Sequence, residues 1–311
     1  MTSTPLRIGT RGSRLALAQT GHVAAAITAA TGREVELITV TTHGDVSRAS
    51  LSSMGGEGVF VGALREALLR GECDLVVHSL KDLPTAAHPQ LALLAIPERA
   101  DARDALCARD GLTLDDLPDG ATVGTGSPRR AAQLRSFRPD LEVVDLRGNV
   151  DTRLGKVSEG TFDAVVLAAA ALGRLELTDI TTDLLPLDAW PTAPGQGALG
   201  IEARADHDLA DVAAALEHEP TRLAVLAERA VLSTLEAGCA APLGAHAVVV
   251  DDVLELAAVV YALDGGTEIG AALSVPLGDD RLTSAREAGA RLATQLLEDG
   301  AAEIAPLGVV S

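Results

Sequence analysis

The sequence is poor in aromatic residues, which make up 2% of its 311 residues: one Trp, one Tyr and three Phe. Base stacking, aromatic cages for cations and aromatic platforms for sugars need such side chains, so the composition argues against these kinds of binding site. Basic residues are also outnumbered, since 25 Lys and Arg face 44 Asp and Glu and give a formal net charge of −19. The average surface therefore repels nucleic acid and anionic membranes, and we expect neither as a partner.

Cysteine is scarce as well, and the three thiols are far apart: Cys73, Cys107 and Cys239. An odd number at such spacing argues against a disulfide framework and against a zinc site with paired ligands, so we expect no metal. No apolar segment has the length of a membrane span, and three Arg residues within the first 14 positions interrupt the only candidate for the core of a signal peptide. The sequence therefore predicts a cytoplasmic protein.

What the sequence does contain is a regular alternation of strand-like and helix-like patterns. Hydrophobic residues make up 47% and charged residues 22%, which is typical of a packed globular chain of two or three domains. The expected elements of a first α/β unit are a strand at 6–9, a helix at 14–30, a strand at 34–40, a helix at 59–70 and a strand at 74–78. Those of a second unit are a strand at 121–124, a helix at 129–137, a strand at 141–146, a helix at 150–158 and a strand at 163–167.

Two short segments predict where the chain crosses between these units. Pro97–Asp104 is charged, and Trp190–Gly197 is rich in Pro and Gly, so a hinge is expected there. Beyond Glu219 the pattern changes to helices at 221–235 and 283–298, with apolar runs between them that are broken at 251–252 and 264–266. This predicts a small antiparallel sheet with helices on it.

Basic residues are concentrated in two parts of this acidic chain. Residues 1–33 contain four Arg and no acid, and residues 129–156 contain seven basic residues against four acidic ones. Guanidinium groups pair with carboxylates or phosphates, so these segments predict a site for an anionic ligand. Salt bridges on solvated helix faces are the alternative for an arbitrary Arg. That alternative is weaker for the five that follow predicted strands or begin helices: Arg11, Arg129, Arg130, Arg147 and Arg153.

Gly124–Arg130 joins a predicted strand to a predicted helix through small residues. Backbone N–H groups, the Ser127 hydroxyl and the helix dipole can all face an anion there. The segment lacks the Gly-Lys-Ser/Thr ending of a Walker loop, and a Gly/Ser loop alone is a weak signal. Leu146–Arg153 repeats the arrangement after the next strand.

Asp74–Asp82 is a buried-type strand that ends in polar residues. Lys81, one of only two Lys in the chain, stands next to Asp82. The pair is either an ion-paired loop or part of a catalytic centre, in which the carboxylate would stabilise developing positive charge and move a proton. His78 is expected to pack in the core.

Cys239 follows a predicted helix and stands among small residues in Leu235–Leu243. An accessible thiol there is either inert or a point of covalent attachment. Cys73 and Cys107 border apolar strands and are expected to be small core residues.

Six of these segments, in this order and spacing, resemble the motifs of the porphobilinogen deaminase (hydroxymethylbilane synthase) family: 11–17 (RGSRLAL), 77–84 (VHSLKDLP), 124–130 (GTGSPRR), 146–149 (LRGN), 194–198 (PGQGA) and 236–239 (EAGC). The resemblance implies two doubly wound α/β domains similar to those of two-lobed periplasmic binding proteins, and a small α+β domain. It assigns residues 1–99 with 198–216 to the first domain, 100–197 to the second and 217–311 to the third, which carries the cysteine.

The resemblance also implies a transferase of porphyrin and haem biosynthesis. Four porphobilinogen molecules would be joined, with loss of four ammonia, on a dipyrromethane cofactor attached through a thioether to Cys239, by a monomeric enzyme. Asp82 would be the catalytic carboxylate beside the cation that forms when ammonia leaves. The residues expected to bind the carboxylates of cofactor and substrate are Arg11, Ser13, Lys81, Thr125, Ser127, Arg129, Arg130, Arg147, Arg153 and Gln196.

Some positions depart from the family pattern. Glu57 stands where many members have Lys, so no role of that Lys is carried over. Gly126 and Pro128 replace the commoner Ser and Leu, and Phe60 is expected either to cover the cofactor as part of a lid or to pack in the core.

Two other kinds of function remain as alternatives. The first is a non-catalytic two-lobed binding protein for a small anion, which would have no use for Cys239 and Asp82 and, if exported, would need a signal peptide. The second is a nucleotide-dependent transferase, which the absence of a Walker lysine and of a dinucleotide fingerprint opposes.

Overall fold

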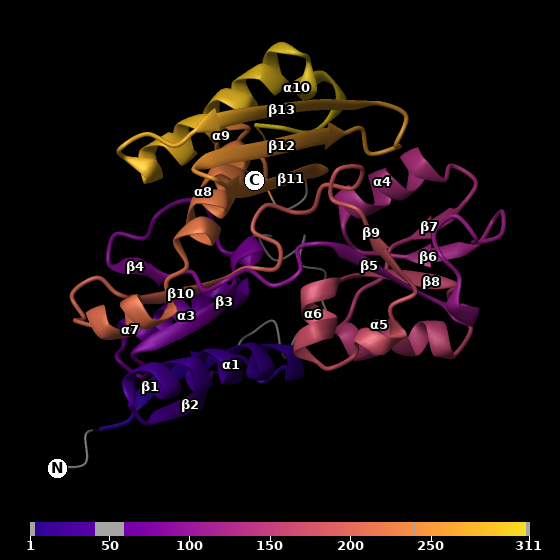
Figure 1. Cartoon of the computed structure of the whole chain (residues 1–311). Helices are drawn as coiled ribbons and strands as arrows, with labels where there is room; N and C mark the ends of the chain where they lie inside the picture. Colours follow the sequence, from indigo (N-terminus) through magenta and orange to yellow (C-terminus); the bar gives the residue numbers. More distant parts are fainter. Residues whose placement is uncertain (1–3, 41–58, 239–240, 309–311) are drawn as a thin grey trace. The chain divides into compact units, whose positions relative to one another are not determined.

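A computed structural model of the chain describes residues 4–40, 59–238 and 241–308 (Figure 1). The chain divides into two compact units. Unit 1 contains residues 1–99 and 198–222, and unit 2 contains residues 100–197 and 223–310. None of the helices in the described ranges combines the length and the hydropathy that a membrane span needs.

Unit 1 is built on a five-stranded mixed sheet in the order β2-β1-β3-β10-β4. Its strands are β1 (Leu6–Thr10), β2 (Val35–Thr39), β3 (Leu75–Ser79), β4 (Leu91–Ala95) and β10 (Leu199–Arg204), and its helices are α1 (Arg14–Thr31), α3 (Val59–Leu69) and α7 (Ala210–Leu216). Strands β1, β2 and β3 are parallel, whereas β10 runs antiparallel between β3 and β4. The return of the chain at 198 therefore completes this sheet.

Helices cover both faces of this sheet because alternate strand residues point to opposite sides. On one face Ile8 and Val77 share a cluster with Val23 and Ile27 of α1 and with residues of α7. On the other face Val76 packs with residues of α3 and with Cys73. A sheet that is buried on both faces is expected for parallel strands joined by helices.

A buried group of charges ties the return strand β10 to the rest of unit 1. Both carboxylate oxygens of Glu202 accept from Arg65 of α3, at 2.9 and 2.7 Å, and His78 Nε2 of β3 lies 3.1 Å from Glu202 Oε2. Burial by itself would raise the pKa of Glu202, but His78 and Arg65 outweigh burial and lower it to about 2. His78 is buried in the core, as the sequence predicts.

We expect Glu202→Gln to weaken the fold in a pH-dependent way. A pKa lowered from the ordinary 4.5 to about 2 stabilises the folded state by roughly 3 kcal/mol, because one pKa unit is worth about 1.4 kcal/mol. This contribution is fully present above the unfolded pKa and is lost as the pH falls through about 2. In urea titrations, the gap in unfolding free energy between the parent and the variant should therefore be widest near neutral pH and should narrow below about pH 4.5. Glu255→Gln, on an exposed strand position, is the control, and a gap that does not change with pH would contradict the assignment.

Unit 2 contains a second five-stranded sheet, in the order β7-β6-β8-β5-β9. Its strands are β5 (Asp104–Ala108), β6 (Thr122–Gly124), β7 (Glu142–Val144), β8 (Ala164–Ala168) and β9 (Asp183–Leu185), and its helices are α4 (Pro128–Phe137), α5 (Val150–Ser158) and α6 (Ala169–Arg174). One face packs against Leu134 of α4, and the other against Val157 of α5 and Leu172 of α6. As in unit 1, one strand is reversed: β5 runs antiparallel between β8 and β9.

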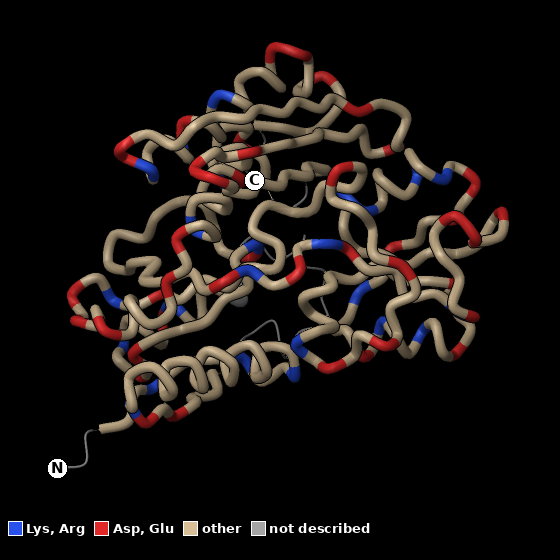
Figure 2. The backbone as a smooth tube through the Cα atoms, in the orientation of Figure 1, with Lys and Arg blue, Asp and Glu red and all other residues tan. Residues whose placement is uncertain are grey.

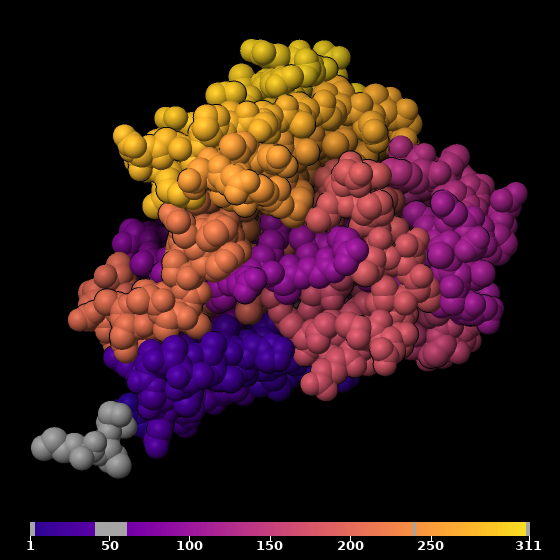
Figure 3. Space-filling view, viewed as in Figure 1, coloured from indigo at the N-terminus to yellow at the C-terminus, as the bar shows by residue number. Residues whose placement is uncertain are grey.

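The rest of unit 2 is an antiparallel sheet of three strands, β11 (Leu243–Val250), β12 (Val253–Tyr261) and β13 (Glu268–Pro276). Helices α8 (Glu219–Thr234), α9 (Arg281–Glu298) and α10 (Ala301–Ile304) share one apolar core with it. Gly265, in the turn after β12, has φ +77, and a Cβ there would lie 2.6 Å from the Cβ of Arg135 on α4. In Figure 3 this part of unit 2 is the orange to yellow surface.

The observed topology confirms the predicted fold class of two α/β sheets and a small α+β part. The predicted strands and helices agree with the observed ones to within about two residues. Four observed strands are absent from the predicted ranges: β4, β5, β9 and β10. Of these, β5 begins at Asp104, at the end of the expected linker, and β10 directly follows the second crossing. Both are the reversed strands of their sheets, whose direction local periodicity does not encode.

Candidate active site

In unit 2 the polar residues singled out in the sequence meet at one edge of the five-stranded sheet. Strands β7, β6 and β8 are parallel neighbours, so their carboxyl ends lie at the same edge. The loop 125–127 follows β6, and the loop 145–149 follows β7. Because β5 is antiparallel, its first residue, Asp104, pairs with Ala168 at the end of β8 and so comes to this edge too.

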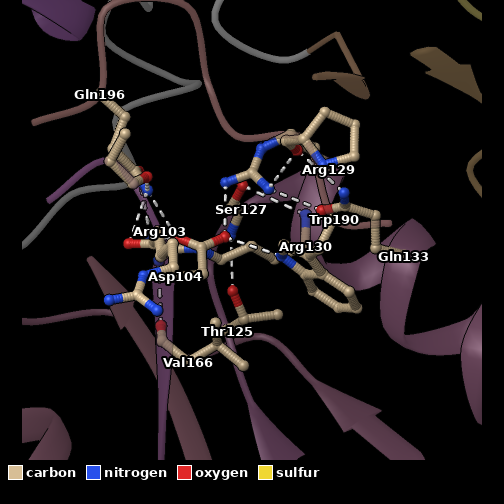
Figure 4. A network of polar contacts seen from close by, with 12 residues as sticks. Arg103, Asp104, Thr125, Ser127, Arg129, Arg130, Gln133, Val166, Trp190 and Gln196 are labelled. Carbon is tan, nitrogen blue, oxygen red and sulfur yellow. Dashed lines mark hydrogen bonds and ion pairs between the residues drawn. The ribbon is translucent and has the colours of Figure 1, made fainter. Parts of the chain in front are cut away.

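The Asp104 carboxylate is the centre of a buried network at this edge (Figure 4). One oxygen accepts from Arg130 Nη2 at 2.6 Å and from Gln196 Nε2 at 2.8 Å, and the other accepts from Arg129 Nη2 and from Trp190 Nε1, both at 2.9 Å. Burial alone would raise the pKa of Asp104, but the charges of the two Arg outweigh burial and hold its pKa far below the usual range. The carboxylate is therefore ionised in the folded protein.

Both guanidinium groups make further hydrogen bonds within unit 2. Arg129 Nη1 donates to Gln133 Oε1 at 2.6 Å and to the Pro191 carbonyl at 3.2 Å, and Arg130 Nη1 donates to the Val166 carbonyl at 3.0 Å. Arg129 is 3% exposed and Arg130 is 6% exposed. The salt bridges of Arg129 and Arg130 with Asp104 are thus buried, and they differ from salt bridges on solvated helix faces.

Two more Arg lie at the same edge, and the charge of Arg147 is balanced there by an exposed salt bridge with Asp145. Arg153 Nε donates to the Gly148 carbonyl at 2.8 Å, and Arg147 Nε donates to Asp145 at 3.1 Å. Burial lowers the pKa of Arg153, and the nearby charges of Arg130 and Arg147 lower it further. Like charges are therefore close enough to disfavour one another, and an anion bound among them would relieve that repulsion.

The small polar residues of the loop 125–127 shape the start of α4. Ser127 is its N-cap and accepts from Arg130 N at 3.4 Å, and Thr125 Oγ1 accepts from Ser127 N at 3.2 Å. Gln196 lies at the second crossing, where its amide also donates to the Ala102 carbonyl at 2.9 Å. Thr125 and Ser127 thus fix the backbone at the start of α4, where the N–H groups of the first helical turn add partial positive charge.

In unit 1 the candidates likewise follow two parallel neighbours, β1 and β3. Arg11 and Ser13 follow β1, and the Ser13 hydroxyl is the N-cap of α1, accepting from Ala16 N at 3.3 Å. Lys81 and Asp82 lie in a turn of 3-10 helix, η2 (Leu80–Asp82), that follows β3, and Asp82 is exposed. Unit 1 thus brings two basic side chains and a carboxylate to one sheet edge.

Three positions noted in the sequence fall outside this description. Cys239 and Glu57 lie outside the described residues, and so does the side chain of Phe60. The other two thiols are core residues, as the sequence predicts: burial raises the pKa of Cys73 and of Cys107 to about 11. Thiols held protonated in this way are poor nucleophiles.

Sequence reasoning missed Asp104 and Trp190 as members of the network. The available signal was an acid at the head of the apolar run 105–108, since a buried strand that starts with Asp needs a cationic partner. Figure 2 shows why net charge could not reveal it: acidic residues, in red, are spread over the whole described chain.

The sheets and their edges define an α/β protein with a group of arginines at one sheet edge of unit 2. Family models match most of its length: "Porphobilinogen deaminase, dipyromethane cofactor binding domain" at residues 6–211 and "Porphobilinogen deaminase, C-terminal domain" at residues 222–298. The chain belongs to the porphobilinogen deaminase family.

Curated relatives agree with the family models. The porphobilinogen deaminase of Leifsonia xyli subsp. xyli is 58% identical, with 97% of this chain and 94% of the relative covered. That of Thermobifida fusca is 52% identical, with 98% and 97% covered. Among solved structures, a periplasmic substrate-binding protein of an ABC transporter from Coxiella burnetii covers 72% of this chain and 94% of its own, at 15% identity and a TM-score of 0.44. The fold class rests on the sheet topology and not on this last similarity.

Proposed function

We propose that the chain joins four porphobilinogen molecules, with loss of four ammonia, on a dipyrromethane cofactor attached to Cys239. Hydrolysis by one water then releases the linear tetrapyrrole hydroxymethylbilane from the cofactor. The overall conversion is a transferase reaction of porphyrin and haem biosynthesis. Membership of the family supports it, and the observation that carries it is the buried positive charge around Arg130 and Arg153.

The charges of this site fit the chemistry of the cofactor. Each pyrrole ring bears an acetate and a propionate group, so a dipyrromethane brings several carboxylates. Asp104 supplies one negative charge to two buried guanidinium groups, which leaves one positive charge in excess, and Arg153 adds another. The buried Nε atoms of Arg129 and Arg130 have no hydrogen-bond acceptor among the described residues. Ligand carboxylates would satisfy these donors.

The proposed binding residues have different tasks. Arg129, Arg130, Arg147 and Arg153 in unit 2, and Arg11 and Lys81 in unit 1, pair with carboxylates. Ser13, Thr125 and Ser127 fix the helix starts so that backbone N–H groups are presented to anions. Gln196 anchors the Asp104 network. Phe60 is proposed as a lid residue.

Asp82 is the proposed catalytic residue. Positive charge develops on the substrate when its ammonia leaves, and the exposed carboxylate on η2 would stabilise that charge and move a proton at the amine or at the pyrrole carbon. When bound, the cofactor supplies the pyrrole carbon that the first substrate joins. Lys81, next to Asp82 in sequence, would bind a substrate carboxylate.

The remaining expectations belong to the same proposal. They are a cytoplasmic monomer that does not bind nucleic acid, and three domains at 1–99 with 198–216, 100–197 and 217–311. An anion-binding protein without catalysis would share the arginines but would not use Cys239 or Asp82.

The mass of the intact purified protein tests the proposal. We expect an excess equal to two linked pyrrole units, located by peptide mapping on the segment that contains Cys239, and release of ammonia from added porphobilinogen. An unmodified Cys239 after incubation with porphobilinogen, together with no ammonia release, would refute it.

A further inference from the structure

Asp104 is a buried charge with no part in the chemistry proposed above. It lies at the first position of β5, it is 0% exposed, and both of its oxygens are taken by N–H donors of the protein. Its four donors come from two separate segments of unit 2: two from α4, and two, Trp190 and Gln196, from the second crossing. A carboxylate in that position cannot contact a ligand without giving up one of these bonds.

The network restrains the guanidinium groups of both arginines. In both arginines Nη2 donates to Asp104. Nη1 of Arg129 donates to Gln133 and to the Pro191 carbonyl. Nη1 of Arg130 donates to the Val166 carbonyl. Arg side chains have many rotamers, so free arginines would lose much conformational entropy on binding a carboxylate. Arginines that are already held lose less, which strengthens binding without a new contact to the ligand.

The single negative charge of Asp104 also sets the net charge of the buried group that it forms with Arg129 and Arg130. One Asp between two buried Arg neutralises one of them, so the pair tolerates burial and still attracts an anion. With no acid the two guanidinium groups would repel each other, and with two acids the attraction for an anion would be cancelled. Figure 4 shows the carboxylate between the two side chains.

We propose that Asp104 is a positioning residue, which orients Arg129 and Arg130 so that they bind the carboxylates of the cofactor and of the growing chain. This inference rests on the proposed function. It concerns binding, so it predicts effects on cofactor content and on KM more than on kcat.

The test compares Asp104→Asn and Asp104→Glu with the parent. Asn keeps the size and removes the charge, whereas Glu keeps the charge and moves it by one methylene. For each protein one measures the fraction that carries covalent dipyrromethane by intact mass, KM and kcat for porphobilinogen per cofactor-carrying molecule, and Tm. In Asp104→Asn we expect cofactor content to fall and KM to rise on the order of tenfold or more, with kcat changed less than about threefold. Asp104→Glu should recover part of the cofactor content and have an intermediate KM.

Asp163→Asn is the matched control. Asp163 is another carboxylate of unit 2 that pairs with an arginine, Arg109, and accepts from Thr122 N at 2.7 Å, but it does not contact Arg129 or Arg130. This variant should lower Tm and leave KM at the parent value. A rise in KM as large as that of Asp104→Asn would show that KM follows stability, and would overturn the positioning role.

The positioning role of Asp104 would also be overturned if both Asp104 variants had the KM and the cofactor content of the parent. If Asp104→Asn does not fold, Asp104→Glu decides by the same KM criterion. If the parent protein itself carries no dipyrromethane and releases no ammonia, the proposed function fails, and this outcome is distinct from an active parent whose Asp104 variants behave normally.

Discussion

Replacing Cys239 by Ser is expected to give a folded protein with no covalent dipyrromethane and no detectable turnover of porphobilinogen. A thioether requires the sulfur nucleophile, and a Ser hydroxyl is far less reactive unless an adjacent base activates it. The measurement is intact mass before and after incubation with porphobilinogen, followed by an assay of ammonia release. Without the anchored primer, the proposed reaction has no place to start.

Cys107→Ala is the matched control for this experiment. Cys107 lies in the core of unit 2, where burial raises its pKa to about 11, so it should carry no adduct and its loss should leave the cofactor in place. An adduct that persists in Cys239→Ser, on any other residue, would defeat the assignment of Cys239.

The second large effect is expected for Asp82→Asn, which should keep the bound cofactor and lose most of its turnover. Asn has nearly the same shape, so binding by the arginines is unaffected, but it neither balances developing positive charge nor accepts a proton. A positioned acid or base contributes about 10² to 10⁴ in rate, and we expect kcat to fall within that range. Intact mass and steady-state ammonia release on the same sample separate cofactor content from turnover.

Asp179→Asn provides a control of the same kind. Asp179 is also an exposed Asp in a turn of 3-10 helix, η4 (Thr178–Ile180), and no proposed function involves it. It should behave like the parent protein. Near-normal kcat in Asp82→Asn would remove Asp82 from the mechanism, whereas loss of the cofactor in that variant would reassign it to binding.

Much of the fold follows from local pattern. The helices α1, α4, α5 and α9 begin and end within about two residues of their predicted positions, because their starts carry Ser, Asn or Asp caps and their apolar residues recur with helical spacing. The buried strands β3 and β8 are short apolar runs that are equally visible in the sequence. In such elements residues close together in the sequence determine the type of secondary structure and where it begins and ends.

The candidate site was predictable to the extent that it follows these strands. Arg130 lies in the first turn of the helix after β6, and Asp82 follows β3, so their places at sheet edges could be inferred from the sequence. The six family motifs are also local features, and they indicate the family by residue type and spacing alone.

Tertiary structure alone decided which charges stand together. Asp104 belongs by sequence to a linker, and it reaches Arg129 and Arg130 because β5 enters the sheet antiparallel to β8 and so starts where β6 and β8 end. Glu202 reaches Arg65 and His78 for the same reason, since β10 is the reversed strand of its own sheet. Periodicity specifies that a segment is a strand and which face it buries, but the direction and neighbours of a strand depend on packing between residues far apart in the chain.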